Sequence, residues 1–193
     1  MVGVKAGRIE AGSAVSIRDP AGHRRRAGMA GNGWDEGPRR RIVVGVNGSP
    51  GSRAALRWAI AEARRTGAGL LAVHAWKSPV GERRALRYPD WPPVVEARET
   101  AADVLAAAME LAFAAGVVAD GELVRGAAAA ALVRIADREG GLLVLGTSTR
   151  TGRFRSARGR DRVAAHCLKH ARCPVLTVPP TAERSEATPA VRL

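Results

Sequence analysis

The chain has 193 residues, of which 46% are hydrophobic and 25% are charged, a composition typical of globular proteins. No apolar run reaches the roughly 20 residues that a membrane helix needs, and the first residues lack the apolar centre of a secretory signal. Two cysteines are too few for a disulfide scaffold. We therefore expect a cytoplasmic protein that does not associate with membranes.

The formal net charge of +13 comes from 28 Arg and 3 Lys against 18 acidic residues. A basic chain is often a partner of nucleic acid or of another polyanion. The strong preference for Arg over Lys, together with heavy use of Ala and Gly, is also what codon bias produces. Basicity alone is therefore weak evidence for such a partner.

Residues 1–40 contain many glycines and a run of three arginines, and no apolar periodicity is sustained there. We predict a disordered basic extension, because such a segment has too little to bury in a core. Residues 41–180 are predicted to form one domain, and residues 181–193 a flexible tail.

Strand and helix patterns alternate from residue 41 onwards. Short β-branched apolar runs predict strands at residues 42–46, 70–74, 117–124, 142–145 and 175–178. Helical spacing predicts helices at residues 53–63, 94–115, 127–137 and 163–170. Residues 77–93, which contain four prolines, are predicted to be a loop. This alternation predicts an α/β fold with a mostly parallel sheet and helices on both faces.

Local signals add detail to the helices. Ser52 is predicted to cap the first helix and Thr66–Gly67 to end it. Each helix is also expected to bury one face. The predicted buried positions are Leu56, Ile60 and Ala63 in the first helix, Val104, Leu105, Ala108, Met109, Leu111, Ala112 and Ala115 in the second, and Val163, Cys167 and His170 in the last.

A ligand crevice in an open parallel sheet lies beyond the carboxyl ends of the strands, where the strand order reverses. Two loops compete for that place: Asn47 to Ser52 after the first strand of the domain, and Gly146 to Asp161 after the fourth. Both are rich in glycine and hydroxyl residues, which let backbone N–H groups approach phosphate.

Three segments resemble the universal stress protein family. Residues 44–59 resemble its opening, where V-G-V-D-G-S precedes a Ser-capped helix, and residues 73–76 resemble its second strand. Residues 170–178 are similar to its H-A-x-C-P-V strand. The resemblance covers residues 40–180 and implies one doubly wound domain with five strands in the order 3-2-1-4-5. It also implies a regulatory or ligand-sensing role in the stress response and a homodimer joined through Val175–Val178.

Members of that family that bind ATP carry Gly, two residues, Gly, nine residues, Gly and then Ser or Thr after the fourth strand. Counted from Gly146, this chain has Thr149, Gly159 and Arg160 at the remaining positions. Counted backward from residues 170–174, the last two positions fall instead on Asp161 and Arg162. In both registers an arginine replaces the hydroxyl.

Some of these differences from the family motif weaken nucleotide binding, and others favour it. Thr149 at a position that needs a positive φ would cost about 1 kcal/mol or more, and Asn47 stands where the family typically has Asp. Against this, Ser148 to Arg172 holds eight bases and one acid, and arginine binds phosphate in a bidentate manner. We expect ATP or another adenine nucleotide to bind weakly or in an altered form, with no metal beyond the Mg²⁺ that accompanies ATP.

The resemblance implies that Val46 and Asn47 lie near the base and ribose, that Val73 lines the adenine pocket, and that the loop after Gly146 lies near the phosphates. The complete set of expected nucleotide-binding residues is Val46, Asn47, Val73, Gly146, Thr149, Gly159, Arg160 and Arg162.

Two alternative functions stay open. One is a polyanion-binding protein that uses the loop Arg150–Arg162 and the basic extension. Nucleic acid is nevertheless not the expected partner, because Phe154 is the only aromatic residue in that loop and single-strand binding usually needs several stacking platforms. The other is a dimeric interaction protein that binds no nucleotide.

Neither a metal site nor a catalytic site is expected. His166, Cys167, His170 and Cys173 have spacing that suits metal ligands, but packing explains them better. His74 is the best candidate for an acid or base, and a hydrogen bond to the backbone accounts for it equally well. We expect no enzyme, although the sequence leaves slow ATP hydrolysis open.

Overall fold

The computed structural model describes residues 15–17, 41–139, 141–147 and 160–180. The strands are β1 (Val15–Ile17), β2 (Ile42–Gly45), β3 (Leu70–Trp76), β4 (Ala119–Arg125), β5 (Leu142–Gly146) and β6 (Val175–Val178). The helices are α1 (Pro50–Thr66), α2 (Glu82–Arg87), α3 (Pro92–Ala114), α4 (Ala128–Glu139) and α5 (Arg160–His170). None of these helices is long and apolar enough to cross a membrane.

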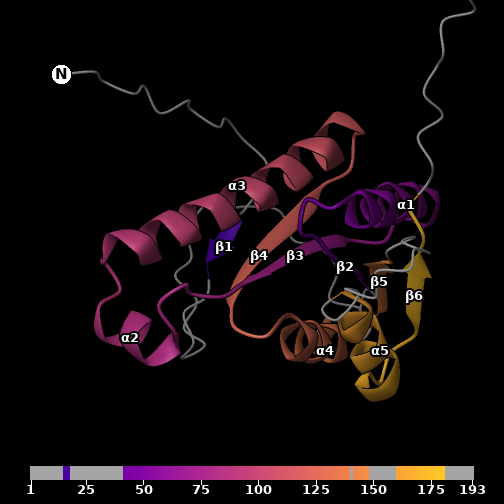
Figure 1. Ribbon diagram of the computed structural model, residues 1–193. Coiled ribbons are helices and arrows are strands. Elements are labelled where there is room, and N and C mark those ends of the chain that lie inside the picture. The colour runs from indigo at the N-terminus through magenta and orange to yellow at the C-terminus, as the bar shows by residue number, and fades with distance from the viewer. Residues whose placement is uncertain (1–14, 18–40, 140, 148–159, 181–193) are drawn as a thin grey trace, which may run out of the picture.

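The strands form one parallel sheet in the order β1-β4-β3-β2-β5-β6. Leaving β1 aside, this is the predicted order 3-2-1-4-5, with β2 as the first strand of the domain. Helices α1 and α3 cover one face of the sheet, and α4 and α5 cover the other (Figure 1). The predicted doubly wound α/β fold is therefore confirmed.

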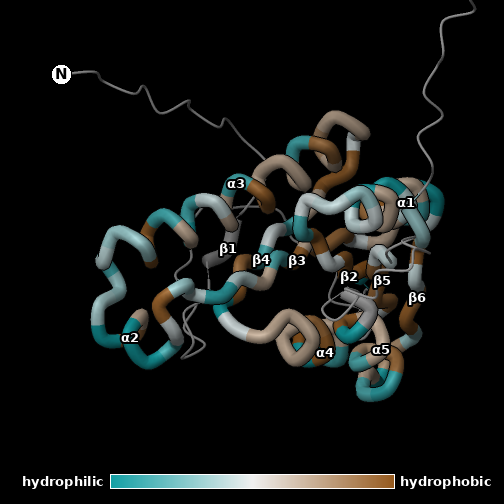
Figure 2. The backbone as a smooth tube through the Cα atoms, in the orientation of Figure 1, coloured by the Kyte–Doolittle hydropathy of each residue, from teal (hydrophilic) through white to brown (hydrophobic). Residues whose placement is uncertain are grey.

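Burial of β2 on both faces explains its continuous apolar sequence. Val44 is fully buried in the cluster under α1 and α3, whereas its neighbour Val43 is fully buried in the cluster under α4 and α5. In β5, Val144 and Leu143 divide between the two clusters in the same way. Figure 2 shows hydrophobic colour on the central strands and mixed colour along the helices that cover them. Both faces of the sheet need apolar residues, so no alternation is seen in the sequence.

The start of α1 differs from the prediction. The helix begins at Pro50, and its N-cap is Ser49, whose hydroxyl accepts a hydrogen bond from the Ser52 amide at 3.2 Å. The assignment of Ser52 as the cap was wrong, because proline is favoured at the first helical position and moves the start towards the N-terminus. The predicted end is confirmed: Gly67 adopts a left-handed φ of 69° and its amide binds the Ala63 carbonyl.

Two elements were not predicted. The six-residue helix α2 lies inside residues 77–93, which were predicted to be a loop. Its residue Ala85 is completely buried. The three-residue strand β1 lies inside residues 1–40 and pairs with β4. The other residues of the predicted extension, and the predicted tail 181–193, lie outside the described residues.

The buried face of α3 is rotated slightly from the prediction. Leu105, Ala108, Met109 and Ala112 are buried as expected, but Leu111 is 47% exposed. In α5, Cys167 is fully buried, whereas His170 is exposed. Helical spacing alone identifies the apolar side of a helix to within about one residue position, and packing against the sheet decides the rest.

Candidate functional site

The candidate site lies at the carboxyl edge of the sheet, between β2 and β5. The strand order reverses between these two strands, so the loops that follow them separate there. The loop after β2 comprises residues 46–49 and leads into α1, while the chain after β5 continues to Thr147 before the described part stops. We call this region the β2–β5 edge.

The loop after β2 is fixed by hydrogen bonds within itself. The Val46 amide donates to the Val73 carbonyl at 2.9 Å, which continues the β2–β3 ladder by one step. The Asn47 side-chain oxygen accepts from the Ser49 amide at 3.1 Å, and the Ser52 hydroxyl accepts from the Asn47 amide at 3.3 Å. This loop is therefore shaped before any ligand arrives.

The same hydrogen bonds determine which groups the loop still offers. Ser52 is buried, and its hydroxyl donates to the Ser49 carbonyl at 3.1 Å, so this hydroxyl serves the loop. Asn47 is exposed, and its oxygen is engaged by Ser49. Its side-chain nitrogen, Nδ2, donates to no other described residue.

Two glycines bring the start of α1 against the end of β5. A Cβ atom on Gly146 would stand 2.1 Å from the Gly51 carbonyl carbon, and one on Gly51 would stand 2.2 Å from the Thr147 oxygen. No side chain fits in either place. Gly146 therefore has a packing role in addition to its predicted place beside a phosphate, and it brings the amino end of α1 to the β2–β5 edge.

Val46 and Val73 are joined through their backbones, but their side chains lie on opposite faces of the sheet. Val46 packs in the cluster under α1 and α3, and Val73, which is 1% exposed, packs in the cluster under α4 and α5. The structure therefore does not bring these two predicted pocket residues together through their side chains.

His74 connects β3 to the same loop. Its Nδ1 atom lies 2.6 Å from the Val46 carbonyl oxygen, and because a carbonyl only accepts, Nδ1 carries the proton in this hydrogen bond. The ring braces the loop, which agrees with the backbone role considered from the sequence.

The predicted phosphate side is only partly described. Thr149 and Gly159 lie outside the described residues, and Arg160 opens α5 with its side chain outside the description. Arg162, in the first turn of α5, is exposed. Like α1, α5 begins at the carboxyl edge, so the partly positive ends of both helices face the same region.

In the part of the chain that is described, no group of three or more histidine, cysteine or acidic residues is placed so that it could hold a metal ion. Burial raises the pKa of Cys167 to about 11, with a smaller contribution from nearby Cys173. Burial and then Asp137 raise the pKa of Cys173. Both thiols are protonated at neutral pH, which suits packing and disfavours metal binding.

Comparison with known proteins gives a consistent result. A family model described as the universal stress protein family matches residues 38–179. No curated protein matches the chain at a significant level. Among solved structures, the chain is similar to a protein of the universal stress protein family from Burkholderia pseudomallei, with 28% identity and a TM-score of 0.55, over 76% of this chain and 100% of that one.

Two further structures extend the comparison. The universal stress protein UspA from Lactobacillus plantarum has a TM-score of 0.60 at 21% identity, over 72% of this chain and 97% of that one, which shows the shared fold. A universal stress protein solved in complex with cAMP has 26% identity and a TM-score of 0.51, over 74% of this chain and 98% of that one.

Proposed function

This chain belongs to the universal stress protein family, and from that premise we propose that it is a regulatory module of the stress response that binds an adenine nucleotide at the β2–β5 edge. The nucleotide is bound weakly or in an altered form, because the glycine and hydroxyl positions of the phosphate loop are changed in the sequence. The universal stress protein bound to cAMP, at 26% identity, supports an adenine ligand for this fold.

One observation supports this function most directly: the loop after β2 is hydrogen-bonded into a fixed shape beside the amino end of α1. A preformed loop loses little conformational entropy when it binds, so modest contacts suffice. Asn47 is exposed at this loop, and its side-chain amide nitrogen is suited to donate a hydrogen bond to an acceptor on the ribose or the base. Arg162 on α5 supplies a cation for the phosphates.

Several finer properties belong to the same proposal. ATP is one candidate among the adenine nucleotides, and Mg²⁺ enters only with it. The module acts as a sensor and catalyses no reaction. It works in the cytoplasm as a homodimer joined through β6, a half-buried strand at the edge of the sheet whose outer side is open to pairing in the described part of the chain.

The first experiment is native purification of the full chain, followed by denaturation and mass spectrometry of whatever is released. Calorimetry of the emptied protein with ATP, AMP and cAMP follows. We expect a bound adenine nucleotide or a measurable heat with at least one of the three. An empty protein with no heat of binding would contradict the proposal and favour a dimeric interaction protein.

A double change at the altered phosphate loop sharpens this test. Thr149→Gly with Arg160→Ser restores the glycine and the hydroxyl of the family motif, so ATP should bind more tightly than to the unchanged chain. The matched control is Arg64→Ser, which removes an exposed arginine near the far end of α1. Unchanged or weaker ATP binding in the double variant would count against a site of the family type.

A further inference from the structure

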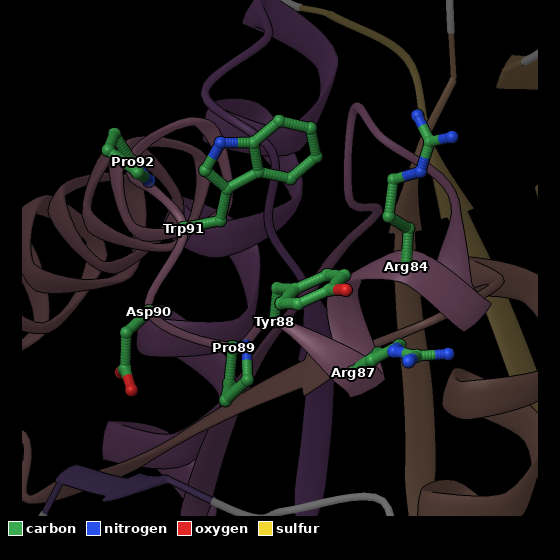
Figure 3. Close-up of a pocket in the computed structure, with 7 residues that line it drawn as sticks. All are labelled: Arg84, Arg87, Tyr88, Pro89, Asp90, Trp91 and Pro92. Carbon is green, nitrogen blue, oxygen red and sulfur yellow. The ribbon is translucent and has the colours of Figure 1, made fainter.

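A second concave surface lies away from the β2–β5 edge, where α2 turns into α3. It encloses about 690 Å³ and is lined by residues 84 and 87–92 (Figure 3). Its lining includes two arginines, Arg84 and Arg87, two aromatic residues, Tyr88 and Trp91, and one acid, Asp90. We call the two arginines and the two aromatic residues the α2–α3 corner. The volume lies in the range of sites for small organic ligands.

The corner is held in place by contacts beneath it. Ala85 of α2 is fully buried, and Glu82 forms an ion pair at 3.2 Å with Arg125 at the end of β4. Val94, in the first turn of α3, is 3% exposed. The ion pair therefore links α2 to β4, while α3 packs on β3 and β4.

The two arginines lie on α2, Tyr88 follows its last residue, and Trp91 precedes the first residue of α3. Arg84 and Arg87 are three residues apart on α2, so they are neighbours on its surface. Tyr88 caps the end of α2, and its amide donates to the Arg84 carbonyl. The Tyr88 ring is 51% exposed and the Trp91 indole 39% exposed, which is unusual for such large side chains. In Figure 3 the indole lies beside the tyrosine ring, with the two arginines on the side away from Asp90.

The positive charge of the corner is available for a ligand. Neither Arg84 nor Arg87 forms an ion pair with an acidic group in the described residues, and the Arg87 guanidinium lies 5.7 Å from the centre of the Tyr88 ring. The amino end of the 23-residue helix α3 adds a partial positive charge. Because α3 opens with two prolines, it offers few N–H groups, so an anion must be bound by the arginines.

We propose that the α2–α3 corner binds one nucleotide unit of single-stranded nucleic acid, with the base stacked on Tyr88 and Trp91 and the phosphate on Arg84 or Arg87. Exposed aromatic rings beside arginines are the combination that single-strand binding uses, because every base has a ring face and every link carries a charge. The net charge of +13 attracts a polyanion from a distance. An acidic peptide would use the charge but not the rings.

The corner supplies what the arginine-rich loop does not. Residues 150–162 contain one aromatic side chain, which is why the sequence alone does not predict nucleic-acid binding. Two rings and two cations meet at α2–α3 only because the chain turns there.

The test measures fluorescence anisotropy of a labelled 20-nucleotide thymidine strand with the full chain. Arg84→Glu and Arg83→Glu form a matched pair, because both residues are exposed on α2 and only Arg84 lines the corner. We expect Arg84→Glu to weaken binding about tenfold more than Arg83→Glu, and to lower the salt slope by about 0.7 for each phosphate that the protein no longer neutralises. If the two substitutions weakened binding equally, the corner would not be the binding site, and the strand would be bound only by the overall positive charge of the protein.

The ring is tested separately. Tyr88→Ala should weaken strand binding about tenfold, whereas Tyr88→Phe, which keeps the ring, should bind like the unchanged chain. Because Tyr88 is half exposed, both variants should fold, and circular dichroism with thermal melting verifies this. Strand binding that is unaffected by Tyr88→Ala would overturn stacking.

Competition identifies the class of ligand. The thymidine strand contains no adenine, so its binding does not report on the adenine site proposed above. If thymidine monophosphate displaced the strand at the same nucleotide concentration, the ligand would be a free nucleotide, and the proposal of a single-stranded nucleic acid would be overturned. If polyglutamate displaced the strand at the same concentration of charges, the ligand would be an acidic protein segment, and the same proposal would be overturned.

Discussion

The part of the carboxyl edge of the sheet where β2 and β5 end is held mainly by backbone contacts and uncharged hydrogen bonds and contains no ion pair among the described residues, whereas the amino edge is held by ion pairs. At the amino edge Arg41 pairs with Asp120 and, at 3.5 Å, with Glu139. Arg138, near the end of α4, pairs with Glu139 at 2.9 Å and extends to Glu122, in the middle of β4, at 3.0 Å. At the β2–β5 edge the contacts are made by Asn47, His74, two serines and two glycines, and the Arg53 guanidinium donates to the Gly48 carbonyl.

Arg138 shows how the charges of the amino edge are balanced. Burial by itself would lower the pKa of Arg138, but hydrogen bonds to Glu139 and Glu122 outweigh it and raise the pKa above its ordinary value. Glu122 is only 4% exposed. Charges that satisfy one another in this way stabilise the fold and leave little for a ligand. The carboxyl edge has no such network of ion pairs among the described residues, and it is the edge at which the nucleotide site is proposed.

The largest expected effect is at the glycine contact of the carboxyl edge. Gly51→Ala should lower the free energy of unfolding by about 3 kcal/mol and the melting temperature by about 10 °C, because the new Cβ would stand 2.2 Å from the Thr147 oxygen. That oxygen cannot move aside easily, since the Thr147 amide is bound to the Val178 carbonyl at 2.8 Å. Urea unfolding measures the loss.

Gly67→Ala is the matched control for that change. Gly51 lies in the first turn of α1 and Gly67 caps its end; Gly67 has a φ of 69°, but nothing lies within 4 Å of the place its Cβ would take. Backbone strain alone should cost about 1 kcal/mol. Equal losses in the two variants would show that the contact between α1 and β5 is not tight.

The amino edge is tested by Arg138→Ala. Removing this cation from nearly buried Glu122 should cost about 2 kcal/mol, less than for a fully buried pair because the Arg138 side chain is 37% exposed. Arg65→Ala, which breaks an exposed pair with Glu62 on α1, should cause no measurable loss. Nucleotide binding should survive Arg138→Ala in calorimetry, and its loss would show that the two edges are coupled.

Cys167, which lies between α5 and the sheet, should make the free energy of unfolding depend on pH. The expected change is similar to or smaller than that of Arg138→Ala. The pKa of Cys167 is raised from 9.0 to about 11, so the fold favours the protonated thiol. The stability this gives is complete below pH 9 and is lost as the pH rises through 11, amounting to about 2 kcal/mol at the upper end. Cys167→Ala removes the titration, so its stability should fall less steeply over this window. Identical pH slopes for the two proteins would contradict the assignment.

The smallest effect is expected at Asn47. Asn47→Ala removes the acceptor for the Ser49 amide and should cost about 1 kcal/mol, with weaker binding of AMP because the loop is less ordered. Asn47→Asp keeps an acceptor at the same place and should retain the stability of the unchanged chain. An alanine variant with unchanged stability and unchanged AMP affinity would show that the loop shape does not depend on this side chain.

Most of the sheet could be predicted because each strand carries its own signal. The apolar runs at residues 42–46 and 175–178 are short, β-branched and bounded by turn residues, so local sequence is sufficient. The strand β1 carries no such signal over its three residues, and its pairing with β4 is a long-range contact. Ser52 was misassigned because two serines stand near the helix start and Pro50 decides between them.

The candidate site was predicted less completely than the fold. Asn47 and Gly146 were found because glycine and polar residues follow apolar strands, and the structure places both at the β2–β5 edge. That Val46 and Val73 face opposite sides of the sheet could not be read from a continuous apolar run, since such a run has no alternation to assign faces. The α2–α3 corner was missed because the four prolines of residues 77–93 favoured a loop.

The sequence by itself determined the class of fold, the order of its strands through a family resemblance, and the two loops in which a ligand should be sought. It did so because apolar periodicity and turn residues act over a few positions. Only the tertiary structure decided that Gly146 must lie against Gly51, that the charges of the amino edge neutralise one another, and that two aromatic rings share a corner with two arginines. These features join residues through space, and no local pattern encodes a contact whose partner lies on another element.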